Sequence, residues 1–184
     1  MRDTIFRNRG YNESMRILTA LLLTIFVSGC TGIPEGVTPV SDFDIGRYLG
    51  KWYEIARLDH SFERGLEQVT AGYSLRDDGG VAVINRGYSA ETGEWDEAHG
   101  KAFFVRSANE GYLKVSFFGP FYGSYIIFVL DSDYRYAFVC GPDKSYLWLL
   151  ARTPTVPDAV IDQFIETSKA LGFDTAQLIF PRQQ

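Results

Sequence analysis

The sequence predicts an all-β protein in which eight short antiparallel strands precede one helix and a brief final strand. Past residue 50, runs of alternating apolar and polar residues recur at a spacing of roughly ten residues. Glycine occurs 18 times, which favours many tight turns between strands. This pattern is typical of an up-and-down barrel or of a β-sandwich.

The first predicted hairpin shows the pattern that the other strands repeat. Between residues 67 and 76, Val69, Ala71 and Tyr73 alternate with polar or small residues. The turn DDGG then leads into a second strand at 81–89. The remaining strands are expected at 51–58, 96–105, 112–118, 124–130, 134–139 and 146–152.

The single helix is expected near the C-terminus, in the segment VPDAVIDQFIETSKALGF. Pro157 suits the start of a helix and Gly172 its end. Apolar residues fall on one stripe, which predicts that the helix packs on the outside of the strands along that face. The stripe consists of Val160, Ile161, Phe164, Ile165 and Leu171, and a short last strand follows at 177–180.

The N-terminal segment has the pattern of a signal peptide. An apolar run from Ile17 to Val27 directly follows Arg16. Its length matches the hydrophobic region of a signal peptide and is too short to cross a bilayer. A buried core helix is the alternative, but basic residues precede the run and a loop-like segment follows it. We therefore interpret residues 1–29 as a signal peptide, with Met15 as an alternative start of translation.

Cys30 ends this segment in the tetrapeptide VSGC. The tetrapeptide resembles the lipobox of bacterial lipoproteins, in which an apolar residue and two small residues precede a lipidated cysteine. The resemblance implies that Cys30 is the first mature residue and carries acyl chains, of which two or more hold a protein stably on a membrane. A disulfide with Cys140 and an unmodified thiol are the alternatives. Because Thr31 rather than Asp follows, the sorting rule of these lipoproteins implies the outer membrane of a Gram-negative bacterium, with the domain facing the periplasm.

The residues after the cysteine are expected to form a flexible connection. The segment TGIPEGVTPVSDFD contains two prolines and two glycines, a composition that disfavours regular structure. We interpret residues 30–42 as the lipidated N-terminus and its tether, and residues from 43 onward as the folded domain.

Charge and motifs argue against several classes of protein. The formal net charge of −5 and the lack of a Lys/Arg run argue against nucleic acid as a partner. His60 and His99 are far apart and lack the spacing of metal ligands. The sequence contains no Gly-x-Ser-x-Gly elbow and no P-loop. We therefore expect no catalytic residues, no metal and no cofactor, so the protein is not expected to be an enzyme.

Three short motifs carry a family resemblance. YLGKWYEIAR places Gly50 and Trp52 just before the first strand, in a Gly-x-Trp pattern. VLDSDYRYA places Asp133 and Tyr134 at a turn, and LWLLARTP places Arg152 at the end of the last barrel strand. In this order and spacing the motifs resemble those of the lipocalin family. Longer stretches such as RLDHSFERG resemble the bacterial outer-membrane lipoproteins of that family.

The resemblance covers residues 43–184 and implies a lipocalin domain. Its fold is an eight-stranded antiparallel up-and-down β-barrel with one C-terminal α-helix packed outside and a short final strand. In lipocalins the tryptophan plugs the closed end and the arginine lies over its indole, a cation–π contact. The resemblance therefore implies structural rather than ligand-binding roles for Gly50, Trp52, Asp133, Tyr134 and Arg152.

Strand alternation predicts which side chains line the interior. If Trp52 points inward, Glu54 and Ala56 share its side, and the Glu54 carboxylate needs a partner, expected to be Arg152 or another donor at the closed end. A barrel of this size holds one small ligand, unless large aromatic side chains fill it. The residues predicted to line a ligand-binding cavity are Tyr73, Asn85, Ala98, Phe104, Val115, Phe117, Tyr122, Ile126, Phe128, Trp148 and Leu150.

Such an apolar cavity suits an acyl chain whose polar end lies near the mouth. The family resemblance implies fatty acids and lysophospholipids as partners, with storage or transport of lipid for membrane maintenance under stress. A haem or porphyrin carrier that uses His60 is one alternative, and a lipocalin-type enzyme is another. A homodimer fits the resemblance, although no motif indicates one.

Overall fold

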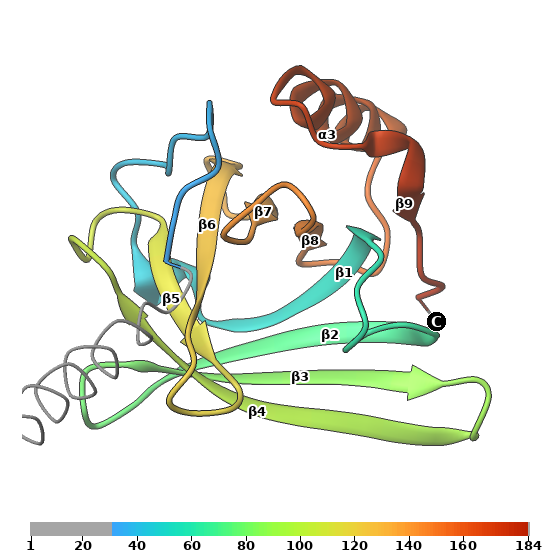
Figure 1. The fold of residues 1–184 in the computed structure, drawn as a ribbon, viewed down its shortest axis with the longest axis horizontal. Coiled ribbons are helices and arrows are strands. Elements are labelled where there is room, and N and C mark those ends of the chain that lie inside the picture. The colour runs from blue at the N-terminus through green and yellow to red at the C-terminus, as the bar shows by residue number, and fades with distance from the viewer. Residues whose placement is uncertain (1–30, 184) are drawn as a thin grey trace, which may run out of the picture.

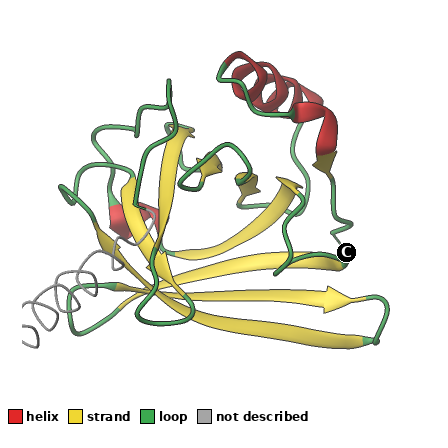
Figure 2. Ribbon diagram, viewed as in Figure 1, coloured by secondary structure: helices red, strands yellow, loops and turns green. Residues whose placement is uncertain are grey.

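The computed structural model describes residues 31–183 (Figure 1). The predicted signal peptide at 1–29 and the predicted lipidation site, Cys30, lie outside these residues. The described chain forms a barrel of strands with one long helix beside it (Figure 2). None of the helices in this part of the chain is long and apolar enough to span a bilayer.

Eight antiparallel strands form the barrel, and each pairs with the next along the chain. The barrel closes because β1 (Gly50–Leu58) pairs with β2 (Leu66–Leu75) on one side and with β8 (Leu147–Ala151) on the other. This closure confirms the predicted up-and-down barrel and excludes the sandwich. The strands between are β3 (Val81–Ser89), β4 (Glu94–Phe104), β5 (Tyr112–Ser116), β6 (Gly123–Leu130) and β7 (Tyr136–Cys140).

One helix covers the outside of the barrel, as predicted. Helix α3 (Asp158–Ala170) begins directly after Pro157 and lies beside the strands (Figure 1). The ring of Phe164 is fully buried and packs against Phe138 of β7 at a centroid distance of 5.1 Å. A short 3-10 helix, η1 (Thr175–Gln177), then leads to β9 (Leu178–Ile179), which pairs with the last residues of β1.

The segment before the barrel is packed against it, so the expected tether over residues 30–42 is wrong for its described part. The backbone N–H of Val40 donates to the Ile127 carbonyl at 2.9 Å, and the N–H of Gly111 donates to the Val40 carbonyl at 2.9 Å. Val37 is buried against the outer face of the barrel. The buried Val37 side chain and the backbone hydrogen bonds of Val40 thus dock the segment on the barrel. The short helix α2 (Ile45–Tyr48) then leads into β1.

Apolar side chains gather in two layers, one on each face of the barrel wall. The inner layer includes Phe43, Trp52 and Val139. The outer layer lies between the wall and α3, and includes Phe138 and Phe164. Side chains of the inner layer face the interior of the barrel, and side chains of the outer layer face away from it.

The strand pairing shifts register at three places, one of them in β2 between Glu67 and Thr70, and the other two are β-bulges that reverse the alternation between these layers. The pairing of β1 with β8 shifts between Glu54 and Ala56, and the pairing of β6 with β7 shifts between Ile127 and Val129. An extra residue in one strand reverses which later residues point inward. Ala56 therefore belongs to the outer layer, and its predicted inward orientation is wrong. Beyond the same bulge, Arg57 shares the side of Glu54.

Candidate ligand-binding cavity

A cavity of about 380 Å³ lies inside the barrel. It opens among the loops that join β1 to β2, β5 to β6 and β7 to β8, where Phe62, Phe117 and Tyr146 border it. Consecutive antiparallel strands place these three loops at the same end of the barrel, here called the open end. The wall is mainly apolar and includes Val69, Ala71, Val81, Val83, Ala102 and Leu113.

Six of the residues predicted from strand alternation lie on this wall. They come from β2, β3, β5 with the loop after it, and β8. In four separate parts of the barrel wall, side chains therefore face the interior as strand alternation predicted. Their contact with a ligand stays a prediction. The six are Tyr73, Asn85, Val115, Phe117, Trp148 and Leu150.

Three other predicted residues lie away from the cavity. Ala98 is exposed, because β4 pairs with β5 only from Lys101 onward and its earlier part projects beyond the barrel. Phe104 packs against Phe43 of the inner layer, with ring centroids 6.2 Å apart, and does not line the cavity. Tyr122 lies in the loop after β5, where its ring packs near Phe103, and it is also absent from the wall.

The predicted inward orientation of Ile126 and Phe128 is wrong. Both side chains belong to the outer layer. Tyr125 lies directly opposite Leu113 of β5, and residues directly opposite in an antiparallel pair share a face of the sheet. Tyr125 and Ile127 therefore point inward instead. Alternation counted from Tyr122 fails because that residue precedes the strand.

The closed end of the barrel is held by Trp52 and Arg152, as the family resemblance implied. The Arg152 guanidinium lies 4.0 Å from the centroid of the Trp52 ring. It also donates to the carbonyls of Lys51 at 3.0 Å and Arg47 at 2.7 Å. Gly50 has a φ of +93°, and a Cβ there would lie 3.5 Å from Nη1 of Arg152. Glycine therefore allows the backbone conformation that passes beside this guanidinium.

The second predicted motif forms the turn between β6 and β7. Tyr134 has a φ of 59°, and its hydroxyl accepts the N–H of Asp44 at 2.8 Å. The acid that organises the turn is Asp131, which accepts the N–H of Asp133 at 3.0 Å and a guanidinium N–H of Arg135 at 2.8 Å. The hydrogen bonds from Arg135 lower the pKa of Asp131 to about 2. The family motif implied a structural role for Asp133, but the carboxylate that makes the hydrogen bonds in this turn is that of Asp131.

Three tyrosines share hydrogen bonds on the cavity wall. The hydroxyl of Tyr125 lies 2.7 Å from that of Tyr48 and 2.8 Å from that of Tyr73. Burial raises the pKa of all three hydroxyls, so they stay neutral. Alternation predicted only Tyr73. Tyr48 comes from α2, and Tyr125 comes from the face of β6 that was expected to point outward.

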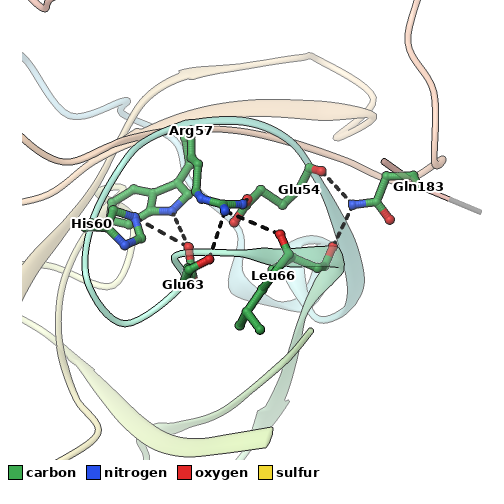
Figure 3. Close-up of polar contacts among 8 residues, drawn as sticks. Glu54, Arg57, His60, Glu63, Leu66 and Gln183 are labelled. Carbon is green, nitrogen blue, oxygen red and sulfur yellow. Dashed lines mark hydrogen bonds and ion pairs between the residues drawn. The ribbon is translucent and has the colours of Figure 1, made fainter. Parts of the chain in front are cut away.

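A group of buried charges lies on another part of the wall (Figure 3). Nη1 of Arg57 lies 2.5 Å from Oε1 of Glu54, and Nη2 donates to the Glu63 carbonyl at 2.8 Å. Nε1 of Trp148 donates to the Glu63 carboxylate at 3.2 Å. The expectation that Glu54 pairs with Arg152 or another closed-end donor is wrong, because the bulge in β1 turns Arg57 to the same side.

The protonation of this group follows from its burial. Burial raises the pKa of both Glu54 and Glu63, and the charge of Glu63 raises that of Glu54 further. The Arg57 guanidinium therefore lies near two carboxyl groups whose raised pKa values favour the protonated form. Burial, followed by the charge of Arg57, lowers the pKa of His60 to about 4, so this imidazole is neutral at pH 7.

The placement of His60 gives no support to a haem carrier. Its ring stacks on Phe62 at a centroid distance of 4.0 Å, and His60 is not among the residues that line the cavity. Within residues 31–183, no group of three or more His, Cys, Asp or Glu side chains is arranged to hold a metal ion.

A closed β-barrel with an apolar internal cavity open at one end is the architecture of a protein that binds one small hydrophobic ligand. A family model described as a lipocalin-like domain matches residues 43–183, and the chain belongs to the lipocalin family.

Known relatives and solved structures agree with this membership. The chain is 63% identical to the Outer membrane lipoprotein Blc of Vibrio cholerae over 171 residues, which cover 92% of this chain and 100% of that protein. It is 54% identical to the protein of the same name from Escherichia coli K12 over 165 residues, which cover 90% and 93%. Insecticyanin from the tobacco hornworm shares the fold with a TM-score of 0.67 at 23% identity, over 83% of this chain and 87% of that one.

Proposed function

We propose that the protein is an outer-membrane lipoprotein that binds fatty acids and lysophospholipids in its barrel. In this role it stores or transports lipids for maintenance of the cell envelope under stress, with the domain facing the periplasm. The observation that carries the proposal is the cavity, which has a mainly apolar wall and reaches the open end of the barrel beside Phe62 and Tyr146. An acyl chain fits such a space, and its polar end would remain at the opening.

The energetics of an acyl chain support this class of ligand. Burial of a sixteen-carbon chain gains roughly 12 kcal/mol at about 0.8 kcal/mol per CH₂ group. Loss of motion by the ligand and ordering of the site remove a large part of that gain. We therefore expect dissociation constants near the micromolar range or somewhat tighter.

Two observations support the membrane anchor. The tetrapeptide VSGC ends at Cys30, which would carry the acyl chains. The relatives from Vibrio cholerae and Escherichia coli bear the name outer membrane lipoprotein. Replacement of Cys30 by Ala should abolish acylation and release the protein or its precursor from the outer-membrane fraction. A Cys30→Ala protein that sediments with outer membranes like the wild type would contradict the anchor.

The ligand class is tested by mass spectrometry of lipids that copurify with the protein, followed by titration of the delipidated protein with lysophosphatidylethanolamine and palmitate. Quenching or a shift of Trp148 fluorescence is the expected signal, because this residue lines the cavity. Haem is titrated in parallel and should give no Soret shift. Tight haem binding together with silent lipid titrations would contradict the proposal.

A further inference from the structure

The open end of the barrel exposes large aromatic side chains to solvent. In the loop between β5 and β6, Phe118 is 79% exposed and Phe121 is 73% exposed. Phe62, in the loop between β1 and β2, is 55% exposed and also borders the cavity. These three residues are called the rim aromatics. Large apolar side chains that are exposed at one end of a molecule mark a surface that gains free energy from a partner.

The first described residues of the chain lie at this same end. The Gly32 carbonyl accepts the hydroxyl of Ser124 at 2.6 Å, and Gly32 lies beside the Pro142 carbonyl. Ser124 and Pro142 both border the cavity near its opening. The Thr31 carbonyl accepts the hydroxyl of Tyr112. The chain therefore leaves the described structure beside the opening.

Cys30 directly precedes Thr31 in the sequence. Residues 31–42 pack on the barrel and supply no slack between it and the cysteine. If acyl chains are attached to Cys30, as the proposed function holds, they emerge beside the cavity opening rather than at the end of a long linker.

From these two observations we infer that the rim aromatics insert into the interfacial layer of a phospholipid membrane, so that the cavity opens directly onto the bilayer. Phe side chains suit this depth because burial of a large apolar ring at the boundary between headgroups and acyl chains gains free energy. Lipids then pass between bilayer and cavity without crossing water. Insertion of Phe118 and Phe121 speeds this exchange without adding to the binding wall, which neither residue lines.

Depth of insertion is measured on the acylated full-length protein reconstituted in vesicles of phosphatidylethanolamine and phosphatidylglycerol. An environment-sensitive fluorophore is attached to Phe121→Cys or, as a control, to Asp77→Cys in the turn after β2 at the closed end. Cys140 does not compete for the label, because it is fully buried and burial raises the pKa of its thiol to about 12. Acylation of Cys30 is verified by mass before the measurement.

The fluorophore at position 121 should shift to the blue and be quenched by a lipid-borne quencher, whereas the one at position 77 should remain in water. A fluorophore at position 121 that stays accessible to an aqueous quencher would overturn the inference. A blue shift that depends on protein concentration and not on lipid would also overturn it, because a second copy would then cover the rim.

The rate of exchange supplies a second measurement. Fluorescent lysophosphatidylethanolamine is transferred from vesicles to the wild type, to Phe118→Ser/Phe121→Ser and to Leu75→Ser. Leu75 is a matched control, since it is 62% exposed but lies at the closed-end terminus of β2. The double variant should take up the lipid about tenfold more slowly at unchanged equilibrium occupancy. Equal rates in all three proteins would overturn the inference.

Failure of the proposed function would give a different result from failure of this inference. If no variant takes up lysophospholipid while position 121 still lies in the bilayer, the ligand assignment fails and membrane insertion stands. If the lipid binds with the same affinity but position 121 stays in water, the ligand assignment stands and the inference about the rim fails.

Discussion

The closed and open ends of the barrel differ in how their aromatic and charged groups are satisfied. At the closed end, Trp52 is fully buried, and its Nε1 donates to the Tyr48 carbonyl at 2.8 Å while Arg152 covers its ring. At the open end, Phe118 projects into solvent. On the cavity wall between them, burial keeps the pKa of Glu54 raised. The closed end thus stabilises the fold from within and the charges of the wall pair with each other, whereas the open end keeps apolar groups that gain from a partner outside the chain.

The largest effect is expected from breaking the closed end. Trp52→Ala should lower the free energy of unfolding by about 3–5 kcal/mol, because it removes a fully buried ring beneath Arg152. Urea unfolding followed by circular dichroism measures the change. Trp95→Ala serves as the control, since this ring on the β3–β4 hairpin is 46% exposed and should alter stability by less than about 1 kcal/mol. Equal losses in the two variants would refute a special role for the closed end.

Removal of the buried cation should come next. Arg57→Met leaves two buried carboxyls without their guanidinium, and should lower the free energy of unfolding by about 3 kcal/mol at pH 7. A carboxyl whose pKa is raised in the folded state binds protons more tightly there, so stability rises as pH falls. The deficit should therefore shrink from pH 7 to pH 5 in urea unfolding.

The double variant Glu54→Gln/Arg57→Met is the control for this pair. It removes one of the two buried carboxyls together with the guanidinium, and should recover part of the stability at pH 7. A deficit in Arg57→Met that is independent of pH would mean that lost packing, rather than charge, causes the effect.

A third comparison sets the inner face of the wall against its outer face. Trp148→Ala should weaken lysophospholipid binding by about 1–3 kcal/mol, the scale of one large apolar contact. Phe128→Ala removes an aromatic ring from the outer layer, where it stacks on Phe173, and should leave the affinity unchanged. Fluorescence titration measures both, after each protein is shown to be folded. The assignment of faces fails if the two variants lose equal affinity.

The smallest effect concerns the turn at the closed end. Asp131 has a folded-state pKa of about 2, below its ordinary value, so its contribution is present above pH 4 and disappears as pH falls toward 2. Asp131→Asn should therefore lower the free energy of unfolding by about 1 kcal/mol at pH 7, because solvent screens part of the pair with Arg135. Near pH 2 the variant and the wild type should be equally stable.

Asp133→Asn is the matched control for that turn. Its backbone N–H, and not its carboxylate, makes the hydrogen bond to Asp131, so the substitution should have little effect at either pH. A larger loss in Asp133→Asn than in Asp131→Asn would reverse the assignment of the two acids.

The sequence allowed the barrel and much of its wall to be predicted, because alternation reports directly on which face a strand residue occupies. Trp148 and Leu150 have the expected phase in β8, and Tyr73 has it in β2. The contact between Trp52 and Arg152 was accessible through the family motifs. No β-bulge separates these strand residues from the positions from which their alternation was counted.

The remainder depended on features that the pattern does not encode. A bulge inserts a single residue, so it reverses the alternation of Ala56 and Arg57 without leaving a composition signal. Whether Ile126 faces the interior depends on the residue at which the preceding loop ends and β6 begins. The exposure of Ala98 depended on the lengths of neighbouring strands, which determine how far β4 projects beyond β5.

The projecting part of β4 has a consequence for molecules crowded together on a membrane. From Glu94 to Gly100, this strand pairs with β3 but has no β5 residue opposite within the described chain, and the hairpin extends far beyond the barrel (Figure 1). An open backbone edge invites a strand from another molecule to add to the sheet. Glu94, Asp96 and Glu97 place three negative charges along this edge. Two such edges repel each other, so the acidic row protects densely packed copies from edge-to-edge aggregation.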